Sequence, residues 1–301
     1  MRILVTDGMD KTAMAKLQEL GHEVVEHFYE PEELGKALRD FDVVVVRSKT
    51  KIRENIIDEA KGGNLKLVIR GGVGVDNIDV KYAEANGIKV TNTPKASSES
   101  VAELALGHML ALARFIGISN HTMRNGEWNK KQYEGVELNG KTLGLIGMGR
   151  ISKALAKRAT ALGMKVIYTD IIGAVPGLDE YTFMSQEEVL KNADFVSLHI
   201  PAAPDGKPVI NAELLSLMKP TAYIINTARG GLICEEALCD ALDAGKLAGA
   251  ALDVFASEPL KCERIMNNPK ISLTPHIGGS TKEAQGRIGM EIVDIISNFQ
   301  K

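Results

Sequence analysis

The sequence predicts an α/β protein with two doubly wound domains, each built on a parallel sheet. Three observations lead to this fold class. Short β-branched apolar runs alternate with helical patterns along nearly all 301 residues. These runs are four to six residues long, which is typical of parallel strands covered by helices on both faces. The alternation starts again near residue 140 with a glycine-rich turn, which indicates a second sheet.

The first part of the chain predicts one sheet of about five strands. Helical patterns such as Lys11–Leu20 and Pro31–Asp40 separate these strands. The strand patterns before residue 95 are ILVTD, EVVEH, VVVVRS, LKLVIRG and IKVTN.

Residues Ser98–Arg124 follow, with apolar residues at helical spacing and no proline. This pattern predicts one long helix that joins the two domains. A large core helix has the same pattern, so that alternative stays open.

The second sheet is predicted from the glycine turn onward, and one amphipathic helix then ends the chain. We expect this last helix to pack back on the first domain. The first domain is therefore predicted to be discontinuous, residues 1–95 plus 279–301, with residues 96–278 as an inserted domain. The strand patterns of the inserted domain are TLGLIG, KVIYTD, DFVSLHI, AYIINTA, AGAALDV and ISLTPH.

Composition excludes several classes of protein. A net charge of −3 does not suit a polyanion partner, so we expect no nucleic acid. The apolar runs are far shorter than a membrane span, and the start MRILVTDG is a strand pattern rather than a signal peptide. The three cysteines, Cys234, Cys239 and Cys262, lack C-x-x-C spacing, which favours free thiols in the cytoplasm over a disulfide framework or a metal site.

The stretch TLGLIGMGRISKALA predicts a dinucleotide site, because a strand precedes its glycines and a helix follows them. Gly147 would make the tight turn, and Gly149 would let the pyrophosphate approach the helix N-terminus. Ser152 stands where the fingerprint usually has its third glycine, a packing position that tolerates a small side chain. Asp170 ends the next strand, where it would bind the ribose 2′-hydroxyl and repel a 2′-phosphate, which favours NAD over NADP. A merely tight turn and an ordinary strand-end aspartate are the alternatives.

Polar residues suited to acid–base catalysis and to carboxylate binding follow three later strands. Oxidation of a secondary alcohol by hydride transfer needs a base for the hydroxyl proton; histidine as a residue type suits this role, and His276 follows the last of these strands. Glu258 beside it would stabilise the imidazolium, and Arg229 can bind a carboxylate through two hydrogen bonds. Asp253 ends one of the same strands. Each of these residues alone is more often structural or solvated, so the prediction depends on their placement at neighbouring strand ends.

NTARGGLICEEAL, AALDVFASEP and TPHIGGSTKEAQGR resemble motifs of the NAD-dependent D-2-hydroxyacid dehydrogenases, and the resemblance covers essentially the whole chain. It implies a flavodoxin-like substrate domain and an inserted Rossmann domain that binds NAD. It also implies that Arg229 binds the carboxylate, that His276 is the acid/base and that Glu258 is its partner. The segment PAAPDGKPVI departs from the family pattern, so Ile200 is the last position carried over there. The implied cofactor contacts are Val73, Gly147, Gly149, Arg150, Ile151, Asp170, Ile200, Thr227, Ala228, Arg229, Asp253, His276, Gly278 and Gly279.

IRGGVGVDNIDV, NGEW and ELNGKTLGLIGMGRI are most similar, within that family, to the phosphoglycerate dehydrogenases. A phosphorylated acid needs more cations than one arginine. Arg47 and Arg70 directly follow buried-strand patterns, so we expect both at the substrate, with Lys49 and Lys51 adding positive field or remaining solvated. The glycine-rich loop after Arg70 would offer backbone N–H groups to the carboxylate. The expected substrate contacts are Arg47, Arg70, Gly71, Gly72, Val73, Arg229 and His276.

The expected reaction is the NAD-linked oxidation of 3-phospho-D-glycerate to 3-phosphooxypyruvate, the entry to serine synthesis, with domain closure aligning the reactants. One alternative is the same chemistry on another D-2-hydroxy acid, such as glyoxylate, hydroxypyruvate or a D-lactate-like acid. Another is an NAD(H)-sensing, corepressor-like binding protein.

The resemblance also implies a short form without a C-terminal regulatory domain, and a homodimer formed through the NAD-binding domain. The segment 120–133, with the only tryptophan, Trp128, is the expected interface arm. A surface loop that buries Trp128 internally is the alternative.

Overall fold

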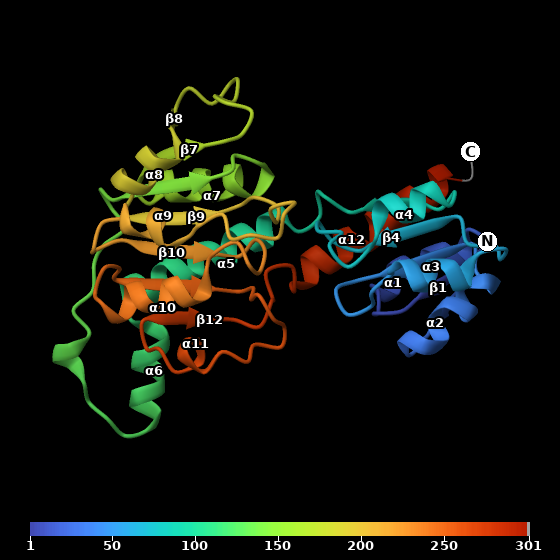
Figure 1. Cartoon of the computed structure of the whole chain (residues 1–301), viewed down its shortest axis with the longest axis horizontal. Helices are drawn as coiled ribbons and strands as arrows, with labels where there is room; N and C mark the ends of the chain where they lie inside the picture. Colours follow the sequence, from blue (N-terminus) through green and yellow to red (C-terminus); the bar gives the residue numbers. More distant parts are fainter. Residues whose placement is uncertain (300–301) are drawn as a thin grey trace. The chain divides into compact units, whose positions relative to one another are not determined.

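The computed structural model describes residues 1–299, which form two compact units (Figure 1). Unit 1 comprises Met1–Ser98 and the C-terminal segment from Gly279, and unit 2 comprises Glu99–Gly278. Each unit contains one sheet, and every strand pair in both sheets is parallel. The predicted fold class, two parallel-sheet α/β domains, is therefore confirmed.

Unit 1 has a five-stranded sheet in the order β2-β1-β3-β4-β5. The five predicted strands are all present. Successive side chains of a strand point to opposite faces, so each strand contributes to two cores. The bounds are β1 (Arg2–Val5), β2 (Glu23–Glu26), β3 (Val43–Val46), β4 (Leu67–Arg70) and β5 (Lys89–Asn92).

Helices cover both faces of this sheet. On one face Ile3, Val43 and Leu67 pack with α1 (Lys11–Glu19) and α12 (Lys282–Phe299). On the other face Leu4, Val44 and Val68 pack with three short helices. The last helix of the chain thus completes the core of unit 1. The three short helices are α2 (Pro31–Ala37), which the 3₁₀ turn η1 (Leu38–Asp40) extends, α3 (Glu54–Ala60) and α4 (Val80–Ala85).

Unit 2 has a seven-stranded sheet in the order β12-β11-β10-β9-β6-β7-β8. All six predicted strands are present. The seventh, β8, was not predicted, because it has only two residues and both are exposed. The bounds are β6 (Thr142–Ile146), β7 (Lys165–Thr169), β8 (Thr182–Phe183), β9 (Phe195–Leu198), β10 (Tyr223–Asn226), β11 (Gly249–Leu252) and β12 (Ile271–Leu273).

Helices cover both faces of the second sheet as well. Met109 of α5 and Leu155 of α7 pack on one face with Leu143 and Leu145 of β6. Side chains of α8, α9 and α10 pack on the other face. The bounds are α5 (Ser98–Ala113), α6 (Ile116–Arg124), η2 (Lys130–Gln132), α7 (Arg150–Ala161), α8 (Gln186–Asn192), α9 (Ala212–Ser216), α10 (Glu235–Asp243) and α11 (Glu263–Met266).

The prediction of one helix over Ser98–Arg124 was wrong. The segment forms α5 and α6, and the two are bent by 63°. Phe115, between them, has a left-handed φ of 55°. The carbonyl of Ala113 accepts a hydrogen bond from the Val136 N–H at 2.9 Å, so a distant segment takes an acceptor of the last turn.

Within residues 1–299, no single helix is both long enough and apolar enough to cross a bilayer, and only the bent pair of α5 and α6 reaches those limits together.

Candidate active site

The glycine turn after β6 lies where the strand order of unit 2 reverses, between β6 and β9. In open parallel sheets, ligands bind beyond the carboxyl ends of the strands at this switch point. Gly147 has a φ of 89°, and a Cβ there would lie 2.7 Å from the carbonyl oxygen of His199 and from the side chain of Ile200. Only glycine fits this turn. The close approach also brings Ile200, a predicted cofactor contact, to the turn.

The helix that follows offers unbonded N–H groups. α7 starts at Arg150, its N-cap is Gly149, and no side chain of the described residues caps it. A helix N-terminus of this kind binds a phosphate group, because its N–H groups and its dipole face the anion. Arg150 and Ile151, both predicted cofactor contacts, form the start of this first turn.

Ser152 strengthens the turn. Its hydroxyl is buried and donates to the carbonyl of Gly147 at 2.6 Å, which ties the helix to the turn. The serine therefore packs at the position where the fingerprint usually has its third glycine, and it adds a hydrogen bond.

Asp170 lies beside the same turn at the end of β7. One carboxylate oxygen accepts the Met148 N–H at 2.7 Å, and the other accepts the Ile172 N–H at 3.1 Å. At the end of β10, the Thr227 hydroxyl is buried and has no hydrogen-bond partner among the described residues, and Ala228 follows it. An uncapped helix, a close glycine turn and an unbonded buried hydroxyl together fit a dinucleotide.

The predicted acid/base residue, His276, follows β12 and has a left-handed φ of 54°. Its Nδ1 lies 2.7 Å from a carboxylate oxygen of Glu258, and the other Glu258 oxygen accepts the Phe255 N–H at 3.2 Å. Both side chains are more than one third exposed. Because the carboxylate takes Nδ1, the Nε2 atom is left to exchange a proton with a substrate.

Arg229 is held in a tight turn after β10. The buried side chain of Asn226 donates to the Arg229 carbonyl at 2.8 Å and accepts the Ala228 N–H at 3.1 Å. A Cβ on Gly230 would lie 1.8 Å from the carbonyl oxygen of Phe255. Glycine here lets the turn of Arg229 touch the loop that carries Glu258, so the structure brings these two predicted catalytic residues to neighbouring segments.

Asp253 is 1% exposed, and its carboxylate accepts three hydrogen bonds. The donors are the Thr274 hydroxyl at 2.6 Å, the Ile277 N–H at 2.8 Å and the Gly278 N–H at 2.9 Å. The carboxylate therefore anchors the turn on both sides of His276. A contact of Asp253 with the cofactor stays a prediction. Thr274 was not predicted as part of the site, since a strand-end threonine gives no signal of its own.

In unit 1, Arg47 follows β3 in a firmly held loop. Its N–H donates to Asp7 at 2.7 Å, and its carbonyl accepts from the side chain of Asn77 at 2.7 Å. Asp7 also accepts two hydrogen bonds from Thr50. Asp7 and Asn77 were not predicted; the position of Asp7 two residues after the end of β1 is the signal that could have found it.

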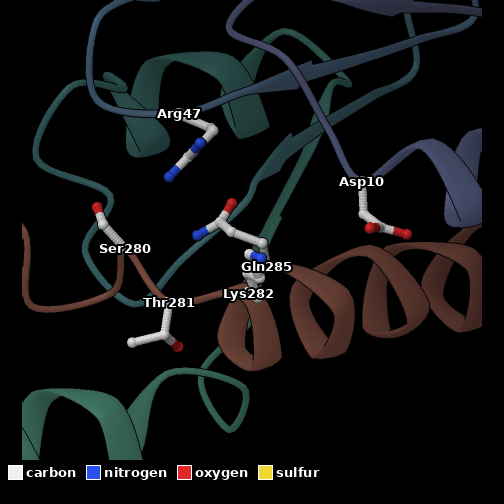
Figure 2. Close-up of a pocket in the computed structure, with 6 residues that line it drawn as sticks. All are labelled: Asp10, Arg47, Ser280, Thr281, Lys282 and Gln285. Carbon is white, nitrogen blue, oxygen red and sulfur yellow. The ribbon is translucent and has the colours of Figure 1, made fainter.

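The side chain of Arg47 lines a pocket of about 490 Å³ (Figure 2). Figure 2 shows its guanidinium directed toward the space beside Ser280 and Gln285, whereas the Asp10 carboxylate points away. No described residue forms an ion pair or hydrogen bond with this guanidinium. The pocket residues near the start of α12 belong to the motif TPHIGGSTKEAQGR, and the sequence predicted no role at the substrate for them. The full lining is Asp10, Arg47, Ser280, Thr281, Lys282 and Gln285.

Arg70 does not line this pocket. It folds back on its own loop, where Nη1 lies 3.3 Å from the carbonyl of Gly71. Gly72 has a φ of 144°, which residues with a side chain rarely adopt, so the loop favours glycine there, and a Cβ would also displace the Arg70 guanidinium. The carbonyl of Val73 accepts a hydrogen bond from Asn92.

Gly279, a predicted cofactor contact, and Lys49, a predicted source of positive field, both contact residues close to them in the structure. The carbonyl of Gly279 accepts from Gln285 at 2.8 Å, which joins it to the pocket of Arg47. Lys49 lies 3.6 Å above the ring of Phe28 and so makes a cation–π contact.

Comparison with known proteins identifies the family. Residues 106–278 match the model of the D-isomer specific 2-hydroxyacid dehydrogenase NAD-binding domain. The chain is 46% identical to a hydroxypyruvate reductase of Thermotoga maritima over 98% of this chain and 97% of that protein. It is 44% identical to a D-3-phosphoglycerate dehydrogenase of Methanocaldococcus jannaschii over 98% of this chain.

The chain spans only 57% of the Methanocaldococcus protein. Among solved structures, an NAD-dependent formate dehydrogenase from Staphylococcus aureus, in complex with NAD, has a TM-score of 0.88 and 30% identity, covering 100% of this chain and 93% of that one. The matched NAD-binding domain, the glycine turn and the His276–Glu258 pair agree with one another. The chain therefore belongs to the D-isomer-specific 2-hydroxyacid dehydrogenase family, and it is an NAD-dependent oxidoreductase.

Proposed function

We propose that this enzyme oxidises 3-phospho-D-glycerate to 3-phosphooxypyruvate, the first step of serine biosynthesis. The observation that carries the proposal is the Arg47 guanidinium, which lines a pocket and pairs with no described residue. A buried or half-buried arginine without a carboxylate is suited to an incoming anion. The resemblance to several D-3-phosphoglycerate dehydrogenases supports the same substrate class.

The start of α12 supports a phosphate site at this pocket. The Thr281 hydroxyl caps α12 by accepting the Ala284 N–H at 3.1 Å, and Thr281 and Lys282 place the N-terminus of this helix at the pocket. Lys282 adds a second cation and Ser280 a hydroxyl to the lining. Phosphate binds well where a helix N-terminus, an arginine and a lysine meet. Asp10 also lines the pocket, but its carboxylate caps α1 by accepting the Ala13 N–H.

The residues of unit 2 supply the chemistry at carbon 2. NAD, when bound, would supply the acceptor for the hydride that leaves this carbon. Arg229 holds the substrate carboxylate, which orients the hydroxyl-bearing carbon. His276 takes the hydroxyl proton at Nε2, and Glu258, bonded to Nδ1, stabilises the imidazolium that forms. Asp170 accepts hydrogen bonds from the adenosine ribose, which favours NAD over a cofactor with a 2′-phosphate.

A second candidate is the reduction of hydroxypyruvate. The Thermotoga hydroxypyruvate reductase is similar to this chain over 97% of its own length, whereas the Methanocaldococcus dehydrogenase is similar to it over 57%. An acid without phosphate would use Arg229 and His276 and leave the pocket of Arg47 without a role. Family membership favours either enzyme over an NAD(H)-sensing binding protein.

Steady-state NADH oxidation with 3-phosphooxypyruvate and with hydroxypyruvate tests the proposal. We expect Arg47→Ala to lower kcat/KM for the phosphorylated acid by about 100-fold, because it removes a charge-assisted pair of about 3 kcal/mol. The same substitution should lower kcat/KM for hydroxypyruvate only slightly. Lys66→Ala, an exposed cation at the start of β4, is the matched control and should change neither rate. Equal loss for both acids, or none, would favour the second candidate.

We further propose a cytoplasmic homodimer. Cys234, Cys239 and Cys262 are all free thiols, which suits a reducing compartment. Trp128 is 77% exposed, so the alternative in which it is buried internally was wrong. An exposed tryptophan on an extended segment supports the assignment of residues 120–133 as an arm that a second copy covers.

A further inference from the structure

A buried histidine lies outside every predicted site. His108 belongs to α5 and is 4% exposed. Its Nδ1 lies 2.9 Å from the Ser272 hydroxyl, and its Nε2 lies 2.9 Å from the Thr274 hydroxyl. Both partners belong to β12 or directly follow it, on the segment that leads to His276. A histidine with a purely structural role needs only hydrogen-bond partners for its two ring nitrogens. Whether His108 does more depends on which residues Ser272 and Thr274 contact in turn.

Thr274 also contacts the Asp253 carboxylate, and this contact fixes the direction of each hydrogen bond of His108. The ionised Asp253 carboxylate can only accept, so the Thr274 hydroxyl donates to it at 2.6 Å. That hydroxyl has spent its single proton, so it accepts from Nε2–H of His108. The Nδ1 atom is then an acceptor, and the Ser272 hydroxyl donates to it. One neutral tautomer of His108 satisfies both of its partners, Ser272 and Thr274, and leaves the Thr274 hydroxyl free to donate to Asp253.

Burial agrees with a neutral ring. Desolvation lowers the pKa of His108, and the negative charge of Asp253 opposes this only in part. A protonated ring would lose the acceptor that Ser272 needs.

The far end of the network holds the turn of the acid/base residue. Asp253 accepts the N–H groups of Ile277 and Gly278, which directly follow His276. A Cβ on Gly278 would lie 3.2 Å from the same carboxylate, so the backbone fits closely against it. His276 itself has a left-handed backbone, which costs about 1 kcal/mol or more for a residue with a side chain. Such a conformation persists only when its surroundings hold it.

We propose that His108 is a positioning residue for His276: through Thr274 it orients the Asp253 carboxylate, which in turn holds the His276 turn in its left-handed form. This inference rests on the proposed role of His276 as the acid/base. His108 touches neither substrate nor cofactor in this proposal. It acts by keeping the imidazole of His276 aligned on Glu258.

Thr274→Val, Thr274→Ser and His108→Phe test the network. Valine keeps the shape of threonine but removes the hydroxyl, and serine restores it. We expect Thr274→Val to lower kcat about tenfold, the effect of one lost hydrogen bond in a site, with little change in KM for NADH. Thr274→Ser should restore kcat to within about twofold. His108→Phe leaves the Thr274–Asp253 contact in place, so its loss should be smaller and in the same direction.

Amide hydrogen exchange gives a second readout, one that needs no turnover. The peptide that contains Ile277 and Gly278 should exchange faster in Thr274→Val and in His108→Phe, while peptides of α10 stay unchanged. Wild-type exchange and wild-type kcat in His108→Phe would overturn the role of His108, whatever Thr274→Val shows. If Thr274→Val does not fold, the same two measurements on His108→Phe decide.

His276→Asn separates this inference from the proposed function. If that variant keeps the wild-type kcat, His276 is not the acid/base and the proposed function fails, whatever the exchange data show. If His276→Asn is inactive while Thr274→Val and His108→Phe match the wild type, only the positioning role fails.

Discussion

His199 lies beside the glycine turn, and its protonation makes the stability of the fold depend on pH. It follows β9, its Nε2 lies 2.9 Å from the Ser197 hydroxyl, and its Nδ1 is buried without a partner among the described residues. Its carbonyl oxygen touches the turn at Gly147. Burial lowers the pKa of His199 from 6.5 to about 4. The folded protein therefore keeps this ring neutral at pH values where the unfolded chain takes up a proton.

The free energy of unfolding should therefore fall as the pH drops from 6.5 to 4. The difference between the unfolded pKa of 6.5 and the folded pKa of about 4 corresponds to about 3 kcal/mol of stability. This stability is fully present above the unfolded pKa and is lost once the ring is protonated in the folded protein. Denaturant unfolding at a series of pH values measures it. His199→Asn should flatten the dependence in this window, and His121→Asn, at an exposed site, should not. Identical slopes for His199→Asn and the wild type would contradict the assignment.

At single residues, strand-end position predicted one side-chain contact of the site but not the direction of two long side chains. Residue type and strand-end position suggested Glu258 beside His276, and their atoms lie 2.7 Å apart; the catalytic roles themselves stay predictions. Position alone could not show that Arg70 folds back over Gly72 while Arg47 lines a pocket. The rotamer of a long side chain depends on neighbours that the loop places only once it has folded.

At the scale of elements, strand periodicity was a reliable signal and helix continuity was not. Buried parallel strands are apolar runs, so the eleven predicted strands could be recognised from local sequence. The two-residue β8 has no such run. The break between α5 and α6 comes from the Val136 N–H, which bonds to Ala113 from a segment more than twenty residues away. A tertiary contact of this kind overrides a local helical pattern.

Packing of α12 against α1 gives a prediction for one element. A Cβ on Gly289 would lie 2.6 Å from the Cβ of Ala13 and 3.0 Å from that of Asp10, so the two helices touch through this glycine. Gly289→Ala should lower the free energy of unfolding by about 1–3 kcal/mol, since the helices must move apart.

Gly286 is the matched control on the same helix. A Cβ there meets nothing within 4 Å, so Gly286→Ala should stabilise the protein by about 0.5–1 kcal/mol through helix propensity. Thermal and denaturant unfolding of the two variants measure both changes. A stabilised Gly289→Ala would show that this contact between α1 and α12 is not close.

At the scale of the whole molecule, the apolar faces of the strands and helices of each unit form the core of that unit. One helix of unit 2, α6, contributes no buried residue to such a core. α6 has nine residues and buries none of them. A helix this short is marginal in water unless another element covers one of its faces. Ile116 and Met123 of α6 are more than half exposed, and Trp128 lies just beyond. A second copy of the chain that packs on this arm would supply the missing cover.

The mass in solution tests this proposal. We expect the wild type to elute with twice the chain mass in size-exclusion chromatography with light scattering. Trp128→Ser combined with Met123→Ser should shift the protein to the monomer mass at low micromolar concentration, because the apolar centre of an interface carries most of its binding energy. Ile171→Ser removes an even more exposed apolar side chain elsewhere in unit 2 and should leave the dimer intact. A monomeric wild type would refute the dimer, and a dimer that survives the double substitution would place its interface on another surface.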